Sequence, residues 1–349
     1  MQVKNRQKAD IANPTNDPAI AAVMDRYAVS LTDHVLSAMQ TEDTAADPVA
    51  RQYLPAADEL VTTPEELDDP IGDDAHSPVK GIVHRYPDRV LLKPVHVCAV
   101  YCRFCFRREK VGPGGEGLSA DELAAAIDYI KNAPQVWEVI LTGGDPFVLS
   151  ARRLRDIMAE LNAIPHVQVI RFHTRVPVAD PSRMTDDVIG ALQSDKAVYV
   201  VLHANHAQEL TDAVKACVKK FVGAGIPLLS QSALLRGVND NPQALEGLFR
   251  ALTAIKVKPY YLHHPDLAPG TSHFRLTIEK GQALMRSLQG RLSGVAIPRY
   301  VLDIPGGHGK VSVEPRWIEP AADGNGYSVR DYRGHTHAYE TRKADPKDQ

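Results

Sequence analysis

The pattern of apolar and polar residues changes near residue 89. Downstream of that point, short apolar runs alternate with stretches of helical periodicity, which is typical of parallel strand-helix units. The apolar runs predict strands over 89–97, 136–142, 167–173, 197–204, 227–233, 257–263 and 297–304. The stretches between them predict helices over 120–132, 151–162, 208–223, 242–255 and 278–291. A barrel or an open doubly wound sheet follows from this alternation.

The residues before this region lack the alternation. Apolar residues near helical spacing after Asp17-Pro18 predict a helix over 18–40. The run Thr63-Pro64-Glu65-Glu66 combines an N-cap, a first-turn proline and a capping-box glutamate, so a second short helix is expected there.

Three parts of the chain are expected from these patterns. Residues 1–80 form a helical and irregular extension, 81–315 the β/α core, and 316–349 a polar C-terminal tail that is expected to fray. The acidic loops of the first part, including 47–48 and 73–74, are interpreted as solvated and are given no role.

Composition and charge narrow the function classes. The 349-residue chain is 44% hydrophobic and 24% charged, with a formal net charge of −3. It lacks the basic excess that a nucleic-acid or anionic-membrane partner normally requires. No apolar run reaches the length of a membrane span, and the first ten residues lack the hydrophobic stretch of a signal peptide. A cytoplasmic location is therefore expected.

Three cysteines lie close together just after the first core strand. Cys98, Cys102 and Cys105 have the spacing C-x3-C-x2-C, so their thiolates can converge on one centre. Iron-sulfur cubanes usually have four cysteine ligands, so three would leave one iron open to another ligand. With His96, the same cysteines would instead make a Cys3His zinc site. The spacing predicts a metal centre and leaves both alternatives open.

Two further stretches follow predicted strands, where α/β folds place their ligands. Gly143 and Gly144 allow close backbone approach to a ligand, although a glycine pair alone is more often a tight turn. The glycine-rich stretch 306–309 lets the chain fold back so that Lys310 points towards the strand ends. A desolvated lysine amine can form a Schiff base with an aldehyde cofactor, whereas a lysine taken alone is more often a surface residue.

Five motifs together carry a family resemblance. They are H-S-P-V-x-G-x-x-H-R-Y-P-D-R-V at 76–90, the cysteine triplet followed by F-R-R at 106–108, L-T-G-G-D-P at 141–146, S-Q-S-A-L-L-R-G-V-N-D at 230–240 and D-I-P-G-G-H-G-K at 303–310. With them the chain resembles, over about residues 47–315, the lysine 2,3-aminomutases of the radical S-adenosylmethionine (SAM) superfamily. The resemblance implies an α/β fold, a partial (β/α) barrel of the radical SAM type with an N-terminal helical extension.

The resemblance also implies an activity and its cofactors. The activity is that of an isomerase that interconverts L-lysine and β-lysine (3,6-diaminohexanoate) by radical 1,2-amino migration. The implied cofactors are a [4Fe-4S] cluster, SAM and pyridoxal 5'-phosphate (PLP). An unactivated carbon offers no acidic proton, so side-chain acid-base catalysis cannot start this reaction, whereas a radical can.

Cofactor ligands are implied position by position. The cluster ligands would be Cys98, Cys102 and Cys105, and the catalytic lysine that holds PLP would be Lys310. The other cofactor contacts would be Arg85, Arg89 and Gln231 for PLP, and Gly143, Gly144, Asp145 and His203 for SAM.

Three charged residues would bind the substrate. Arg107 would bind the α-carboxylate, a bidentate task suited to a guanidinium, and Asp266 and Asp303 would bind the distal ammonium. Two converging aspartates are costly unless they meet cations, which favours a substrate with an ammonium group. The alternative is that either aspartate pairs with an arginine of the protein.

Other interpretations stay open at this point. Arginine as the substrate would also pair with two aspartates, whereas the aspartates would repel the side chain of a glutamate substrate. The product would serve lysine metabolism or supply β-lysine for modification of elongation factor P. A non-catalytic iron-sulfur or zinc protein would need neither Lys310 nor the aspartates. The inter-subunit zinc site of some family members is not expected, because Asn241 occupies the place of a cysteine ligand and no cysteine follows Cys217.

The expected partners are few. They are a small amino acid substrate and a one-electron reductant such as flavodoxin or ferredoxin. No nucleic-acid or membrane partner is expected, and a homo-oligomer is left open.

Overall fold

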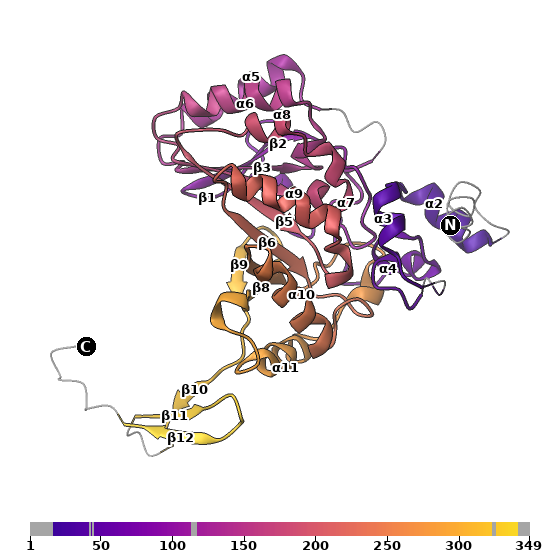
Figure 1. Cartoon of the computed structure of the whole chain (residues 1–349), viewed down its shortest axis with the longest axis vertical. Helices are drawn as coiled ribbons and strands as arrows, with labels where there is room; N and C mark the ends of the chain where they lie inside the picture. The colour runs from indigo at the N-terminus through magenta and orange to yellow at the C-terminus, as the bar shows by residue number, and fades with distance from the viewer. Residues whose placement is uncertain (1–16, 42, 44, 113–116, 323–325, 341–349) are drawn as a thin grey trace.

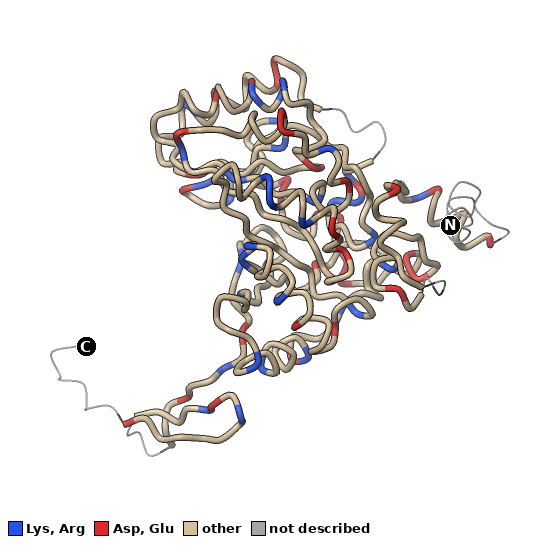
Figure 2. Tube along the Cα trace, viewed as in Figure 1, with Lys and Arg blue, Asp and Glu red and all other residues tan. Residues whose placement is uncertain are grey.

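The computed structural model describes residues 17–41, 43, 45–112, 117–322 and 326–340. Among these residues, no helix is long and apolar enough to cross a membrane. Positive and negative side chains are interspersed along the trace (Figure 2).

A nine-stranded sheet in the order β1 to β9 forms the centre of the molecule (Figure 1). Strands β2 to β8 are parallel, and β1 and β9 pair antiparallel at the two edges. The sheet curves without closing on itself, which confirms the partial barrel that the family resemblance implied. Its strands are β1 (Ile82–Tyr86), β2 (Arg89–Val95), β3 (Glu138–Gly143), β4 (Val169–Thr174), β5 (Ala197–His203), β6 (Leu228–Ala233), β7 (Val257–His263), β8 (Arg299–Ile304) and β9 (Gly309–Ser312).

Helices between the parallel strands cover the outer face of the sheet (Figure 1). Six of them begin at a side chain that accepts a hydrogen bond from the N–H three residues later, and the capping residues are Ser119, Ser150, Thr185, Thr211, Asn241 and Thr277. Their buried faces are apolar and pack on the strands. The helices are α5 (Ala120–Lys131), α6 (Ala151–Asn162), α7 (Val176–Ala179), α8 (Asp186–Gly190), α9 (Asp212–Gly223), α10 (Pro242–Ala254) and α11 (Ile278–Leu288).

The predicted helix over 18–40 is wrong, because the structure has two shorter helices. They are α2 (Pro18–Arg26) and α3 (Asp33–Ala38), and α4 (Ala50–Tyr53) follows. Tyr27 ends α2 in an extended conformation and is buried, with the Arg108 guanidinium 3.5 Å from its ring centre. This tertiary contact interrupts the apolar periodicity that the sequence suggested.

The short helix predicted at Thr63 is also wrong, because the chain forms only a turn there. Half of the expected capping box exists, since the Glu66 carboxylate accepts the Thr63 N–H at 3.3 Å. The same carboxylate also binds Arg275 and the Gly270 N–H. The N–H of Leu67 donates to the Leu267 carbonyl at 2.8 Å, so contacts with the distant 267–275 segment replace helical hydrogen bonds.

The C-terminal tail does not fray over the residues that are described. It forms a three-stranded antiparallel sheet of β10 (Ile318–Pro320), β11 (Tyr327–Arg330) and β12 (Thr336–Tyr339), which extends away from the barrel (Figure 1). Residues 341–349, which end the predicted tail, lie outside the described residues.

A buried ion pair fixes the extension to the cysteine loop. Glu59 is fully buried, and its carboxylate accepts two hydrogen bonds from Nε of Arg103, at 2.9 and 3.0 Å, and one from Nη2 at 2.5 Å. Arg108 pairs with the same carboxylate. A buried carboxylate with such partners is strongly bound, and the removal of its charge leaves two arginines unpaired.

We therefore expect Glu59→Gln to lower the free energy of unfolding by about 3 kcal/mol, as for a broken buried ion pair. Urea unfolding followed by circular dichroism measures this loss. Glu160→Gln is the matched control, because the ion pair of Glu160 with Lys131 is exposed and should contribute less than about 1 kcal/mol. Equal losses in the two variants would contradict the structural role of Glu59.

Candidate active site

A cavity of about 670 Å³ lies inside the partial barrel and extends to the carboxyl ends of its strands. Its lining includes every residue to which the family resemblance gives a site role. These residues are Arg85, Arg89, Cys98, Cys102, Cys105, Arg107, Gly143, Gly144, Asp145, His203, Gln231, Asp266, Asp303 and Lys310. Most of them lie at or just after the carboxyl ends of parallel strands, which meet at one edge of the sheet. Arg85 lies on the edge strand β1, and Arg89 begins β2. His96, the fourth ligand of the zinc alternative, is not among the described residues that line this cavity.

The cysteine loop leaves β2 and turns within the cavity. The N–H of Cys105 donates to the Cys102 carbonyl at 3.1 Å, and the N–H of Arg108 donates to the Cys105 carbonyl at 3.2 Å. In the described part of the chain, no three histidine, cysteine, aspartate or glutamate side chains are arranged to hold one metal ion. An iron-sulfur cubane takes one thiolate on each iron, so it does not require the three sulfurs to meet at one ion.

Burial controls the protonation of the three thiols. It raises the pKa of Cys98 and of Cys105, and it raises the pKa of Cys102 to about 11. Thiolates in this loop therefore need a compensating positive charge, which bound metal supplies. The three residues fit a metal cluster that binds with loss of their protons.

The glycine stretch after β3 packs closely on the strand that leads to the cysteines. A Cβ on Gly143, whose φ is +114°, would lie 2.6 Å from the Val95 carbonyl oxygen. A Cβ on Gly144 would lie 2.2 Å from the Val97 carbonyl oxygen. Only glycine fits both positions, and both glycines line the cavity that the three thiols also line.

The carboxylate of Asp145 has structural partners. It accepts hydrogen bonds from the Thr174 hydroxyl at 2.7 Å and from the N–H groups of Arg175 and Val176 at 2.6 and 3.1 Å. The N–H of Phe147 donates to it as well, at 3.0 Å. Its side chain thus joins β3 to the start of α7, and it is the backbone of this stretch that is available to a ligand.

The β8-β9 hairpin places Lys310 opposite Asp303. The two residues are cross-strand partners, and Nζ of Lys310 donates to Oδ1 of Asp303 at 2.7 Å. Gly306 and Gly307 form the turn with φ values of +81° and +83°, which other residues rarely adopt. The N–H of Lys310 donates to the Tyr86 hydroxyl at 2.7 Å. Lys310 lines the cavity with Arg85 and Gln231, so these side chains fit an aldehyde cofactor with a phosphate group.

The two aspartates of the site differ in charge state. Burial alone would raise the pKa of Asp303, but His263 and Lys310 hold it well below the ordinary range. Burial and the charge of Asp303 raise the pKa of Asp266 to about 7. Asp303 pairs with the cations of Lys310, at 2.7 Å, and Arg85, at 3.8 Å, whereas a further cation beside Asp266 would favour its charged form.

Asp73 was missed by the sequence interpretation, which treated its loop as solvated. The residue is 3% exposed, and its Oδ2 accepts from Nε and Nη2 of Arg107 at 3.0 and 2.8 Å. Arg85 donates to the other oxygen at 3.1 Å, and Nζ of Lys93 lies 3.8 Å away. Asp73 therefore orients two arginines of the site. No local signal reveals this role, because the partners are 12 to 34 residues away in the chain.

The interpretation of the acidic loops as solvated is also wrong for Asp47. This residue is fully buried and accepts the N–H groups of Val49 and Ala50 at 2.8 and 2.9 Å, at the start of α4. The N–H of Gln40 donates to its other oxygen at 2.7 Å. The residue fixes the segment that carries Gln52 and Tyr53 to the barrel wall.

Comparison with known proteins agrees with this site. The sequence model of the radical SAM superfamily matches residues 92–246, which include the three cysteines and the glycine stretch. The fold and the site together define a radical SAM enzyme. A lysine-2,3-aminomutase model matches residues 285–348.

Individual relatives show which family of the radical SAM superfamily the chain belongs to. L-lysine 2,3-aminomutase of Methanococcus maripaludis is 41% identical over 86% of this chain and 69% of its own length. L-lysine 2,3-aminomutase of Clostridium subterminale is 39% identical over 86% of this chain and 72% of its length. Glutamate 2,3-aminomutase of Clostridioides difficile is 36% identical over 84% of this chain and 68% of its length. The chain belongs to the lysine 2,3-aminomutase family.

The raised pKa of Asp266 predicts a pH dependence of stability. The pKa of this carboxyl is about 7 in the folded protein and near 3.8 when unfolded, so the folded state binds more protons between these values. The contribution of the Asp266 carboxyl to the free energy of unfolding is therefore present at low pH and is lost as the pH rises to about 7.

Asp266→Asn removes this titration. In cofactor-free protein, the free energy of unfolding of the variant should rise relative to that of wild type by about 1 to 3 kcal/mol as the pH goes from 5 to 8. One pKa unit corresponds to about 1.4 kcal/mol. Urea unfolding at several pH values measures the difference. A difference that is constant over this range would show that Asp266 does not titrate there.

Proposed function

We propose that this chain interconverts L-lysine and β-lysine by a radical 1,2-amino shift. The observation that carries the proposal is the single cavity in which three thiols, Lys310, an arginine and two carboxylates converge. Each class of group has one task in this reaction, and membership in the lysine 2,3-aminomutase family supports the assignment.

The family uses a [4Fe-4S] cluster, SAM and PLP, and the residues present fit all three. Cys98, Cys102 and Cys105 would hold the cluster. The other cofactor contacts would come from Gly143, Gly144, Asp145 and His203 for SAM, and from Lys310, Arg85, Arg89 and Gln231 for PLP. When bound, the cluster and SAM supply a carbon radical, and PLP supplies the carbonyl group that takes up the amino nitrogen. The electron would come from a reductant such as flavodoxin or ferredoxin.

Arg107 would bind the α-carboxylate of the substrate. Asp73 bonds to two nitrogens of its guanidinium and so fixes the plane that a bidentate contact needs. This orientation would hold the substrate carbon chain in one direction across the cavity. The correct direction matters because hydrogen has to be removed from one carbon only.

Asp266 and Asp303 would bind the distal ammonium. Asp266 ionises only near neutral pH because Asp303 and burial oppose its charge, so a substrate cation there would stabilise the carboxylate. The glutamate enzyme is nearly as similar overall as the lysine enzymes, so overall identity alone does not select the substrate. Two carboxylates at this place would favour a cationic side chain over that of glutamate, because they would repel a side-chain carboxylate.

Lys310→Ala should abolish β-lysine formation, because no other amine would hold PLP at the hairpin. Reconstituted enzyme should keep its iron and sulfide content and lose the visible absorbance of bound PLP. Lys131→Ala, on the outer face of α5, is the control and should keep wild-type turnover. Continued turnover by Lys310→Ala would remove this residue from the catalytic role.

Asp303→Asn should raise the KM for L-lysine by tenfold or more, as expected for the loss of about 1.4 kcal/mol or more of binding. Steady-state kinetics of β-lysine formation measure it. Asp128→Asn, an exposed substitution on α5, should leave KM unchanged. An unchanged KM in Asp303→Asn would mean that this carboxylate does not bind the substrate.

A further inference from the structure

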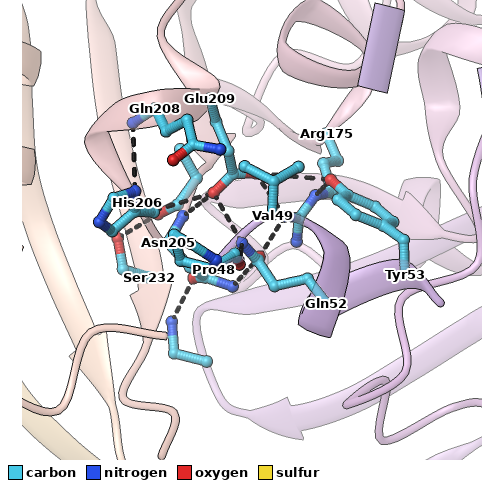
Figure 3. Close-up of polar contacts among 12 residues, drawn as sticks. Pro48, Val49, Gln52, Tyr53, Arg175, Asn205, His206, Gln208, Glu209 and Ser232 are labelled. Atoms are coloured by element: carbon cyan, nitrogen blue, oxygen red, sulfur yellow. Dashed lines mark hydrogen bonds and ion pairs between the residues drawn. The ribbon is translucent and has the colours of Figure 1, made fainter. Parts of the chain in front are cut away.

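Buried carboxylates around the cavity are of two kinds. Glu209 is 3% exposed, and its oxygens accept hydrogen bonds from Nη2 of Arg175 at 2.6 Å and from the N–H groups of Asn205 and His206 at 2.7 and 2.9 Å (Figure 3). Both of its oxygens are thus bound by the protein itself, so this carboxylate is structural. Asp303 differs, because its two oxygens face different kinds of groups and both the carboxylate and its neighbours line the cavity.

His263 ends β7, next to the strand that carries Asp303. Its Nδ1 lies 3.6 Å from Oδ2 of Asp303. The other oxygen, Oδ1, accepts from Nζ of Lys310 at 2.7 Å, and Nη1 of Arg85 lies 3.8 Å from it. His263 therefore faces the oxygen of Asp303 that these two cations leave, and it has no part in the reaction proposed above.

The imidazole ring of His263 is held in place. It packs edge-on against the ring of Tyr261, with the ring centres 5.6 Å apart and the planes at 75°. Both neighbouring strands bind the backbone here, since the N–H of Leu234 donates to the His263 carbonyl at 2.9 Å and the N–H of His264 donates to the Val301 carbonyl at 2.7 Å. A side chain fixed by packing and backbone bonds can set the direction of a carboxylate beside it.

Imidazole is a donor that need not add charge to the site. Burial lowers the pKa of His263 and the charge of Lys310 acts in the same direction, although Asp303 raises it. The ring is therefore neutral at neutral pH, and a neutral ring that faces a carboxylate through Nδ1 carries its proton on that nitrogen. A third cation would offset more of the negative charge of Asp303, whereas a neutral donor leaves that charge for a cation of the substrate.

We propose that His263 is a positioning residue that directs the Asp303 carboxylate towards the distal ammonium of L-lysine by donating Nδ1–H to Oδ2. This inference rests on the proposed function, which gives Asp303 that task. The separation of 3.6 Å is longer than a hydrogen bond, and such contacts commonly shorten when the ligand binds. The ammonium then meets a carboxylate whose rotation is already restricted, so binding costs less ordering.

The test is the affinity for two amino acids that differ only at the distal carbon. L-lysine and L-norleucine have the same carbon chain, and only lysine carries the distal ammonium. Anaerobic titration calorimetry of enzyme with bound cluster and PLP, without SAM or reductant, measures both dissociation constants. The variants are His263→Asn and His263→Leu, whose new side chains have the same branching, although only asparagine has an N–H donor.

His263→Leu should bind L-lysine about fivefold or more weakly than His263→Asn, as for the loss of one hydrogen bond to a charged group. The two variants should bind L-norleucine equally. In protein that also carries Asp303→Asn, the two variants should bind L-lysine equally, because no carboxylate remains to be directed. His335→Leu is the control, since that side chain is 71% exposed in the C-terminal sheet, and it should bind both amino acids as wild type does.

Equal L-lysine affinity of the two variants would overturn the proposal. An equal loss for L-norleucine, or an undiminished difference in the Asp303→Asn protein, would also overturn it, because a general disturbance of the cavity does not depend on the ammonium or on Asp303. If L-norleucine binds too weakly to measure, the Asp303→Asn comparison decides. If His263→Leu binds no PLP, His263→Phe replaces it, because phenylalanine keeps a ring and removes the donor.

Asp303→Asn alone separates this inference from the proposed function. If that variant binds L-lysine as wild type does, the substrate role of Asp303 fails together with the role of His263. If it weakens L-lysine binding while the two His263 variants do not differ, the proposed function stands and the inference about His263 fails alone.

Discussion

Compensation of buried charge is the constraint on which the site depends. Glu59 pairs with Arg103 and Arg108, which flank Cys105 in sequence, so the N-terminal extension fixes the cysteine loop from outside. Asp73, which also belongs to the extension, binds Arg107 and Arg85. Unpaired, these charges would be expensive to bury, so the barrel and the extension stabilise each other. The extension is therefore part of the active-site wall and more than a preface to the barrel.

Compensation of buried charge also governs which ligands the cavity favours. The thiols need positive charge before they ionise, and Asp266 needs a cation near neutral pH. Asp303 already has Lys310 and His263 beside it. A site arranged in this way gains stability from a metal cluster and a cationic substrate, and it gains nothing from a carboxylate side chain in the same place. Compensation of buried charge thus links ligand binding, the charge states of the side chains and the proposed substrate.

Sequence reasoning predicted the barrel well because its signals are local. Strand β7 matches its predicted range of 257–263, and α6 matches 151–162, since apolar periodicity and caps lie within each element. Site roles could be predicted for residues that belong to long motifs, and these residues line one cavity. Asp73, Glu59 and Arg175 were not found, because each depends on a partner that only the folded chain brings near. The failed helices at 18–40 and 63–66 have the same cause, since long-range contacts of Tyr27 and Glu66 override local preference.

One anaerobic experiment can test whether this cavity rearranges lysine. The most direct measurement is anaerobic reconstitution with iron, sulfide and PLP, then incubation with SAM, dithionite and each of L-lysine, L-arginine and L-glutamate, with products identified by mass spectrometry. We expect β-lysine from L-lysine and no β-amino acid from L-arginine or L-glutamate. Bound cluster and bound PLP with no β-lysine, or β-glutamate as the product, would contradict it.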